Sequence, residues 1–151
     1  MTSIYESLIC DLKIKLKNKN IKFNKLFNLI NNQKYDEIKK IIHDETIQIL
    51  IKNIVSERKT IGNNMEKKLN NFLWLNELLI LFNEEPQLSK TKALMLLKTK
   101  VFINIYDLEA EKYETTTKML LRNELRKKPE RRFPLFCAKE NETVKCFLIK
   151  I

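Results

Sequence analysis

Residues 72–82 of this chain read FLWLNELLILF and form its longest apolar stretch. Because the segment is apolar on nearly every side, it predicts a central helix that neighbouring elements cover all round. We expect this helix to begin near Asn64 and to be closed by Pro86. A partner-binding groove or an oligomer seam is the alternative use of such a segment. The stretch is too short to span a membrane, and Asn76 and Glu77 interrupt it.

The composition around this stretch also favours helices. The 151 residues include one glycine and three prolines, so there are few places where a sheet-rich fold could turn tightly. No internal repeat is visible, and a chain of this length is expected to form one domain over residues 1–151. The sequence therefore predicts a mainly α, single-domain helical bundle of five to seven helices.

The start of the chain has the pattern of an amphipathic helix. Ser3 and Glu6 match a capping box, and apolar residues follow at four-residue spacing as far as Leu16. Residues 12–17 also alternate with period two, so a strand is the competing interpretation there.

Helices are also expected over residues 23–30 and 36–55. The phase of the apolar stripe shifts near Asp44, which indicates a kink or a restart at that point. The lone Gly62 is followed by two asparagines and predicts a loop at the end of a helix.

Two more helices are expected after Pro86. Ser89 can cap the first of them. Asp107 can cap the second, which is expected to run over residues 108–127 and to end before Pro129.

The last part of the chain has a different pattern. Residues 135–138 and 144–149 suit extended strands, and they flank a polar corner at residues 139–143. This arrangement predicts a short C-terminal β-hairpin over residues 133–151, after a helical body over residues 1–132. An isolated hairpin is marginal in water, so we expect it to pack on the helices.

Catalysis and metal binding find little support in the sequence. His43 is the only histidine, and a surface position beside a helix break explains it more simply than a catalytic triad does. One histidine and three separated cysteines provide no spacing typical of a metal site. A single glycine excludes the glycine-rich phosphate loops of nucleotide-binding proteins. We therefore expect no catalytic residue, no metal and no cofactor.

The cysteines and the amino terminus suggest a compartment. Three cysteines, an odd number, argue against a disulfide framework. We expect Cys10 to be a small buried side chain, and Cys137 and Cys146 to be reduced even if a hairpin brings them together. The first residues lack the basic start, apolar run and cleavage site of a secretory signal. Cytoplasm or nucleus is therefore the expected location.

The formal net charge of +10 is concentrated in two runs. The first run joins the first two expected helices without an acidic residue and contains Lys13, Lys15, Lys17, Lys19, Lys22 and Lys25. The second run has only two acidic residues among its cations, which are Lys118, Arg122, Arg126, Lys127, Lys128, Arg131 and Arg132.

Two explanations compete for these runs. Lysine, asparagine and isoleucine codons are rich in A and T, so nucleotide bias accounts for part of the basicity. Four of the five arginines fall in the second run, however, and such bias does not favour arginine. Arginine suits bidentate phosphate contacts, and the following Phe133 and Phe136 can either stack on bases or bury in the core. A solvated helix end, whose cations complement the helix dipole, is the simpler explanation.

The sequence favours a non-enzymatic basic module that contacts nucleic acid or acts within a nucleoprotein complex. The second run is expected to make the main contact and the first run to assist. The alternative is a protein-only helical adaptor or regulator, monomeric or dimeric, that uses an apolar groove or the hairpin edge. Expected partners are thus nucleic acid or an acidic protein surface, with self-association as an option. An enzyme whose site the sequence does not disclose is a third possibility.

One consequence of the basic-module hypothesis concerns stability. Exposed charges contribute little to the free energy of unfolding. Changing Arg126, Arg131 and Arg132 together to Gln is therefore expected to leave the fold intact.

Overall fold

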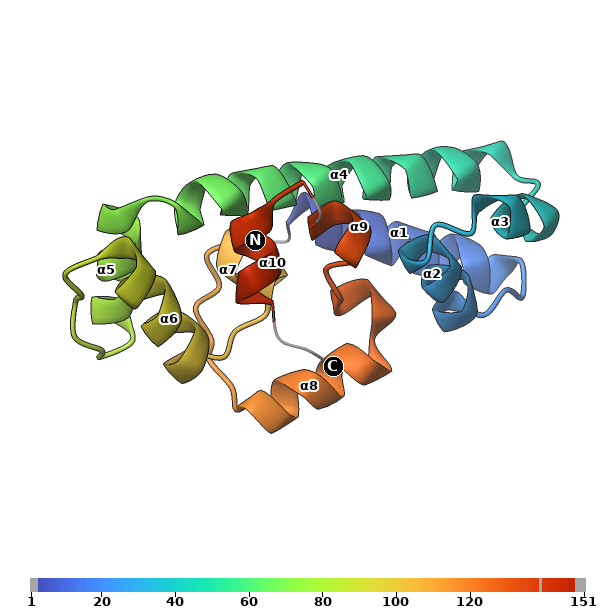
Figure 1. Ribbon diagram of the computed structural model, residues 1–151. Helices are drawn as coiled ribbons and strands as arrows, with labels where there is room; N and C mark the ends of the chain where they lie inside the picture. The colour runs from blue at the N-terminus through green and yellow to red at the C-terminus, as the bar shows by residue number, and fades with distance from the viewer. Residues whose placement is uncertain (1–2, 139, 149–151) are drawn as a thin grey trace.

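The computed structural model describes residues 3–138 and 140–148. The chain is mainly helical (Figure 1). Its helices are, in chain order, α1 (Ile4–Asn18), α2 (Phe23–Asn31), α3 (Tyr35–Ile41), α4 (Glu45–Leu69), α5 (Phe72–Leu81), α6 (Lys90–Lys100), α7 (Ile105–Glu109), α8 (Lys118–Lys127), the 3₁₀ turn η1 (Pro129–Arg131), α9 (Leu135–Ala138) and α10 (Glu142–Phe147). The chain has more helical segments than the five to seven expected, because the helix expected over residues 108–127 is divided and because α9 and α10 occupy the segment expected to form a hairpin.

The local capping signals at two helix starts are confirmed. The Ser3 hydroxyl accepts from the Glu6 amide at 3.1 Å, and the Ser89 hydroxyl accepts from the Lys92 amide at 3.2 Å. Each serine thus satisfies an amide that has no partner within its own helix. α1 is helical throughout residues 12–17, so the strand alternative there is excluded.

The longest helix, α4, has the central position in the fold. Its 25 residues cross the top of Figure 1 and pack against α1, α5, α7, α9 and α10. Asp44 caps it by accepting from the Thr46 amide at 2.8 Å, and α3 ends before it at Ile41. The expected break near Asp44 is therefore confirmed. The buried residues of α4 are Ile47, Leu50, Ile51, Ile54, Arg58, Ile61, Gly62, Met65 and Leu69.

The apolar stretch of residues 72–82 forms α5, and the prediction that this helix is central is wrong. One face of α5 packs against α4 and α6, and Leu75 and Leu79 are buried on it. On the other face, Leu73 is 69% exposed and Ile80 is 57% exposed. The segment is apolar on nearly every side, but only the face that meets α4 and α6 is buried.

Gly62 does not form the expected loop, because it lies buried inside α4. A Cβ added at Gly62 would stand 2.8 Å from Cζ of Phe133 and 3.1 Å from Nδ2 of Asn141. Carbon atoms in favourable contact are about 3.5–4.0 Å apart. Glycine is therefore required here for the close approach of the C-terminal segment to α4, and not for a turn.

The helix expected over residues 108–127 is divided into α7 and α8. Asn104, not Asp107, caps α7, since its Oδ1 accepts from the Tyr106 amide at 2.9 Å. Glu111 then takes a positive φ of 60°, which a right-handed helix cannot continue through. α8 begins after Thr117, and Leu121 and Leu125 are its buried residues.

The C-terminal β-hairpin expected over residues 133–151 is wrong. The described residues of this segment form α9 and α10, and no β-strand occurs in the part of the chain that the structure describes. Glu66 on α4 explains the helical start of α10, because its carboxylate accepts from the amides of Thr143 at 3.0 Å and Val144 at 2.9 Å. First-turn amides need such a partner. A capping group that lies 77 residues away leaves no mark on the local sequence.

Lys139 and residues 149–151 of the expected hairpin lie outside the described residues. An isolated antiparallel bridge joins Phe102 to Thr116. Within the described ranges, no helix combines the length and the apolar character that crossing a membrane requires.

Candidate functional site

Arg58 of α4 is fully buried and binds the connection that leads from α8 to α9. Its Nε donates to the Tyr5 hydroxyl at 3.2 Å, and its Nη1 donates to Asn31 Oδ1 at 2.6 Å. Its Nη2 donates to the main-chain carbonyl of Arg132 at 3.1 Å. The guanidinium also lies 4.7 Å from the ring centroid of Phe27, a favourable cation–π arrangement. A buried charge is costly without such partners, so Arg58 ties three distant segments together.

Every main-chain carbonyl from Pro129 to Arg132 accepts a hydrogen bond from a side chain far away in the sequence. Asn31 donates to the carbonyl of Pro129, and Tyr5 donates to that of Glu130. Asn104 donates to the carbonyl of Arg131, whereas Arg58 and Tyr106 both donate to that of Arg132. The rings of Tyr5 and Tyr106 stack with their centroids 4.3 Å apart. Burial raises the pKa of Tyr106 well above its usual value, so its hydroxyl remains a donor. Distant side chains therefore fix η1 and the residue that follows it.

The fold itself uses two arginines of the second basic run. Arg131 pairs with Asp107 at 2.6 Å and with Glu124 at 3.0 Å, and its side chain is 16% exposed. Arg132 Nε donates to the carbonyl of Leu125 at 2.6 Å, and so satisfies an orphan carbonyl in the last turn of α8. The expectation that the triple Gln change leaves the fold intact assumed exposed charges, and that assumption is wrong for Arg131 and Arg132.

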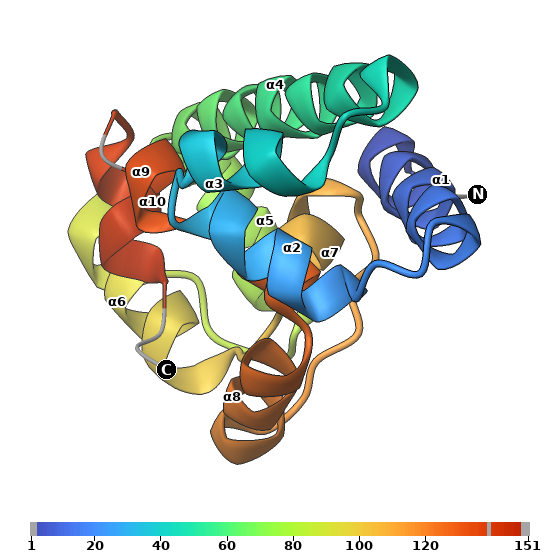
Figure 2. The same ribbon diagram turned by 90° about the vertical axis from the view of Figure 1, so that its right-hand side faces the viewer.

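The first basic run meets the C-terminal end of α8. Figure 2 shows α2 above α8, with α1 beside them. Lys13 Nζ lies 3.5 Å from Glu130 Oε1 in η1, and Asn24 Nδ2 of α2 donates to the carbonyl of Lys127 at 3.4 Å. Lys17 shares the face of Lys13 through its four-residue spacing. The two basic runs therefore converge at this point.

Not every lysine of the first run takes part in this convergence. Lys15 lies on the other side of α1, together with Lys19, whose Nζ is 3.8 Å from Asp44 Oδ2. The structure therefore does not bring Lys15 to the second run. We call the exposed cations where the runs meet the junction surface; they are Lys13, Lys17, Arg126, Lys127 and Lys128.

A groove of about 1180 Å³ opens between α8 and α10, and the C-terminal ends of α2 and α6 border it. The rings of Phe102, Phe133 and Phe136 contribute apolar surface to it, and Glu142 is the one acidic residue among its described lining residues. The basic residues that line the groove are Lys98, Lys118, Arg122, Arg132 and Lys145. The groove therefore combines an excess of positive charge with aromatic surface.

This groove unites residues that the sequence placed in separate elements. Lys118, Arg122 and Arg132 belong to the second basic run, whereas Lys98 lies near the end of α6 and Lys145 lies on α10. Neither Lys98 nor Lys145 was among the residues expected from the sequence. Lys145 has no cationic neighbour within four positions, whereas Lys98 belongs to a lysine-rich segment, residues 90–100, whose four lysines have no acidic residue among them and could have been found. They join the site only through the packing of α6 and α10 around α8.

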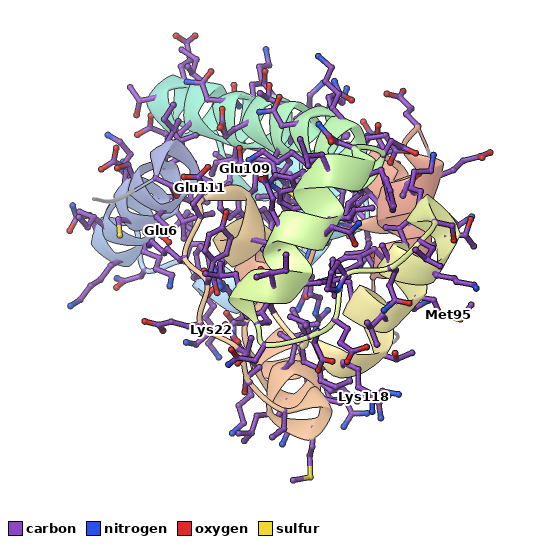
Figure 3. The ribbon with its side chains drawn as sticks, turned by 90° about the vertical axis from the view of Figure 1, so that its left-hand side faces the viewer. Glu6, Lys22, Met95, Glu109, Glu111 and Lys118 are labelled. Atoms are coloured by element: carbon purple, nitrogen blue, oxygen red, sulfur yellow. The ribbon has the colours of Figure 1, made fainter. Side chains whose placement is uncertain are left out.

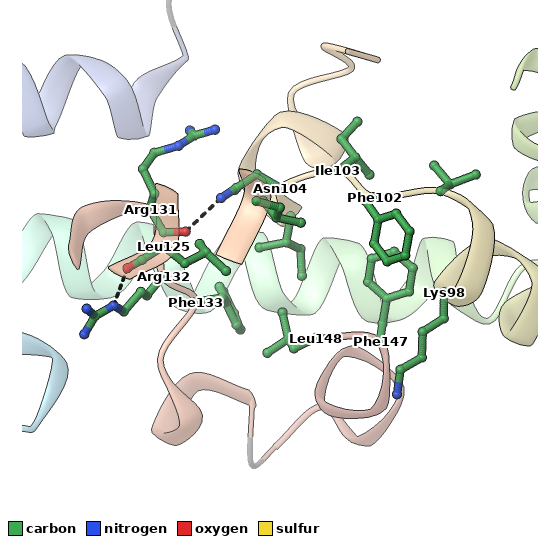
Figure 4. Close-up of a pocket in the computed structure, with 13 residues that line it drawn as sticks. Lys98, Phe102, Ile103, Asn104, Leu125, Arg131, Arg132, Phe133, Phe147 and Leu148 are labelled. Carbon is green, nitrogen blue, oxygen red and sulfur yellow. Dashed lines mark hydrogen bonds between the residues drawn. The ribbon is translucent and has the colours of Figure 1, made fainter. Parts of the chain in front are cut away.

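A smaller hollow of about 80 Å³ lies beside the groove (Figure 4). Its lining is mostly apolar. Figure 4 shows Lys98 at one end of this hollow and Arg132 at the other, with the rings of Phe102 and Phe133 between them. The residues that line both spaces are Lys98, Phe102, Arg132, Phe133 and Leu148. The apolar part of the groove is therefore recessed.

Three carboxylates lie at some distance from Lys118, which lines the groove. Figure 3 shows Glu6, Glu109 and Glu111 on one side, apart from Lys118. The pKa of Glu57 is raised by burial and by the nearby charge of Glu109. None of these glutamates lines the groove, and Glu6 is paired with Lys112 at 2.7 Å.

The cysteine thiols and the other potential metal ligands do not gather at one metal site in the described part of the chain. Among the described residues, no group of three or more His, Cys, Asp or Glu side chains is placed to bind a metal ion. Cys10, Cys137 and Cys146 are free thiols. Cys10 is exposed, so the expectation that it is buried is wrong, and Cys146 is exposed in the groove. Burial raises the pKa of Cys137 to about 11, which makes this thiol a poor nucleophile at neutral pH.

No protein-family model matches the chain, and comparison with curated proteins and with solved structures gives no match. The geometry of the groove and the charges around it are therefore the basis for inferring its function.

Proposed function

We propose that this protein is a non-enzymatic basic module that binds the phosphates of nucleic acid, alone or within a nucleoprotein complex. The observation that carries this proposal is the groove, in which cations from α6, α8, α10 and the connection after η1 face one space. Among the described residues that line the groove, Glu142 carries the single carboxylate. Lysine and arginine that neutralise phosphates release counterions from the nucleic acid, so a surface of this kind favours a polyanion.

α8 links the groove to the junction surface. Its first half carries Lys118 and Arg122 at the groove, and its C-terminal end carries Arg126 and Lys127. A helix of 10 residues is about 15 Å long. One nucleic-acid strand that follows α8 therefore reaches both surfaces, which supports the combined use of the two basic runs.

The test is the salt dependence of nucleic-acid binding by the full chain. We expect log Kd to change linearly with log salt. Changing Lys118 and Lys145 together to Gln should reduce that slope by about one unit per lost phosphate contact. The matched control changes Lys52 and Lys67, two exposed lysines of α4 outside the groove, and should leave the slope unchanged. Equal effects of the two pairs would contradict the proposal.

The cytoplasm or the nucleus is the location that fits this function, because nucleic acid is found there. The three free thiols support a reducing compartment. Fractionation of cells that express a tagged full-length chain tests this location.

A protein-only adaptor is the second candidate function, and the apolar outer face of α5 favours it. Leu73, Ile80 and Leu81 are each more than half exposed on that helix. Contiguous apolar surface of this kind marks interaction sites, and a second copy of the chain is the simplest partner. Sedimentation velocity tests self-association through this face. A parent chain that is a dimer and an Ile80→Asp variant that is a monomer would support self-association. A monomeric parent chain would exclude self-association.

A further inference from the structure

We infer that the groove binds a single strand of nucleic acid, with the phosphates along its cationic rim and the bases against its aromatic side chains. This inference rests on the proposed function and narrows it to one class of ligand. It depends on three features of the groove: the placement of its charges, the exposure of its rings and its recessed apolar wall.

The charges lie where a phosphate backbone would run. Lys98, Lys118 and Lys145 are exposed, and they come from three helices that surround the groove. Arg132 adds a fourth positive charge, although hydrogen bonds to the last turn of α8 fix its guanidinium. An anionic polymer that lies in the groove therefore meets positive charge on several sides, and Glu142 is the one opposing carboxylate in its described lining.

The aromatic side chains discriminate between paired and unpaired bases. Phe102 and Phe136 are partly exposed in the groove, and Phe133 is buried behind them. A ring can stack only on a free base face, and every base of a single strand can offer one. A duplex hides these faces within its own stack and shows only base edges and phosphates. The rings therefore favour an unpaired strand.

The recessed wall adds a second argument against a duplex. The hollow of about 80 Å³ continues inward from the groove, and Phe102, Phe133 and Leu148 line both spaces. A duplex is stiff over about 150 base pairs and does not bend into a recess of this size without cost. A flexible single strand can direct a base toward the recess while its phosphates remain at the rim.

The three cysteines provide a reporter of groove occupancy in the unmodified chain. Cys146 is exposed and lines the groove, whereas Cys10 is exposed on α1 and is not part of that lining. Cys137 is buried with a raised pKa and does not compete for reagent. A ligand in the groove should therefore slow alkylation of Cys146 by N-ethylmaleimide and leave alkylation of Cys10 unchanged.

The experiment compares four probes by fluorescence anisotropy and by cysteine alkylation at one salt concentration. The probes are oligodeoxythymidylate, oligouridylate, a DNA hairpin duplex of equal charge and polyglutamate. We expect either or both single strands to bind at least about tenfold more tightly than the duplex and to protect Cys146. The two single strands show whether DNA or RNA is preferred.

Two ring variants test the stacking contribution. Phe102→Leu and Phe136→Leu should each weaken single-strand binding by about tenfold. The salt slope should remain unchanged, because neither change removes a phosphate contact. Circular dichroism checks the fold of each variant, and the protection of Cys146 in the parent chain decides the question if a variant does not fold.

The outcomes separate this inference from the proposed function. A duplex that binds as tightly as the single strands and protects Cys146 would show that the groove does not select unpaired bases; the inference then fails and the proposed function stands. Binding of nucleic acid without protection of Cys146 would place it outside the groove and overturn both. Polyglutamate that binds as tightly and protects Cys146 would identify the groove as a site for an acidic protein, and the inference also fails. The absence of salt-dependent binding to any nucleic acid would overturn both.

Discussion

Arg58 Nη2 donates a hydrogen bond of 3.1 Å to the main-chain carbonyl of Arg132, which lies 74 residues further along the chain. The Tyr106 hydroxyl donates to the same carbonyl at 3.0 Å. Two buried side chains thus fix Arg132, which lines the groove next to Phe133. The position of the candidate site therefore depends on a polar cluster in the core of the protein.

Replacing Arg58 with Met should destabilise the protein. The change removes the donor to Asn31 Oδ1 and the donor to the Tyr5 hydroxyl oxygen, and each unsatisfied group costs about 1–3 kcal/mol. We expect the free energy of unfolding in urea to fall by about 3 kcal/mol. Lys59→Met, at the adjacent exposed position of α4, is the matched control and should have little effect. Equal effects of the two changes would exclude a structural role for the buried guanidinium.

Replacing Gly62 with Ala should also destabilise the protein, although the same change usually stabilises a helix by about 1 kcal/mol. The new Cβ would clash with the ring of Phe133, whose Cζ would lie 2.8 Å away. Overpacking of this kind costs about 1–3 kcal/mol. The penalty should shrink when Gly62→Ala is measured in a Phe133→Leu background. An unchanged penalty in that background would show that the ring is not the obstacle.

The arginines of the second basic run should differ in their effect on stability. Arg131→Gln removes two ion pairs, to Asp107 and Glu124, from a largely buried side chain. We expect thermal unfolding to show a loss of about 1–3 kcal/mol. Arg126→Gln, at an exposed position, should leave the unfolding temperature unchanged. A stable Arg131→Gln variant would restore the original expectation that this arginine is free to contact a polyanion.

The helical start of α10 should depend on pH through Glu66. Burial opposes ionisation of Glu66, but hydrogen bonds from the Val144 and Thr143 amides outweigh it and lower its pKa below the ordinary value of 4.5. A lowered folded-state pKa means that the stabilisation is present at neutral pH and is lost as pH falls through 4.5 towards the folded-state pKa.

The measurement is urea unfolding of the parent chain and of Glu66→Gln across this pH range. We expect the parent to be more stable at pH 7 and the difference to diminish below about pH 4. Glu77→Gln, at an exposed position of α5, serves as the control. A difference between parent and Glu66→Gln that is independent of pH would exclude the capping role of the Glu66 carboxylate.

The two faces of α5 should respond differently to a new carboxylate. Leu79 is fully buried, so Leu79→Asp should unfold the protein, since an unpaired buried charge costs several kcal/mol. Ile80 is 57% exposed, so Ile80→Asp should leave the helical circular dichroism spectrum unchanged. Loss of the helical spectrum in Ile80→Asp would mean that the outer face of α5 is part of the core.

Much of the local helical pattern could be predicted from the sequence. The caps at Ser3 and Ser89 and the break at Asp44 each depend on residues within a few positions of one another. The scarcity of glycine and proline points to helices for the same local reason. Such interactions are encoded in short segments, so periodicity and residue type reveal them directly.

The errors arose where a distant residue decides the local structure. Gly62 looks like a loop signal beside two asparagines, but the ring of Phe133 is what requires it. Residues 144–149 suit a strand, but Glu66 caps a helix that covers residues 142–147. The stretch at residues 72–82 is apolar on all sides, but the fold covers only the face that meets α4 and α6.

For the candidate site, residue order is enough to show that cations are plentiful and that Lys118, Arg122 and Arg132 belong to one run. The ion pairs of Arg131 and the position of Lys145 at the groove depend instead on how the helices pack. The difference is one of range. Caps and apolar periods act within about one helical turn, whereas the direction of a side chain depends on packing and hydrogen bonds between segments that are far apart in the chain.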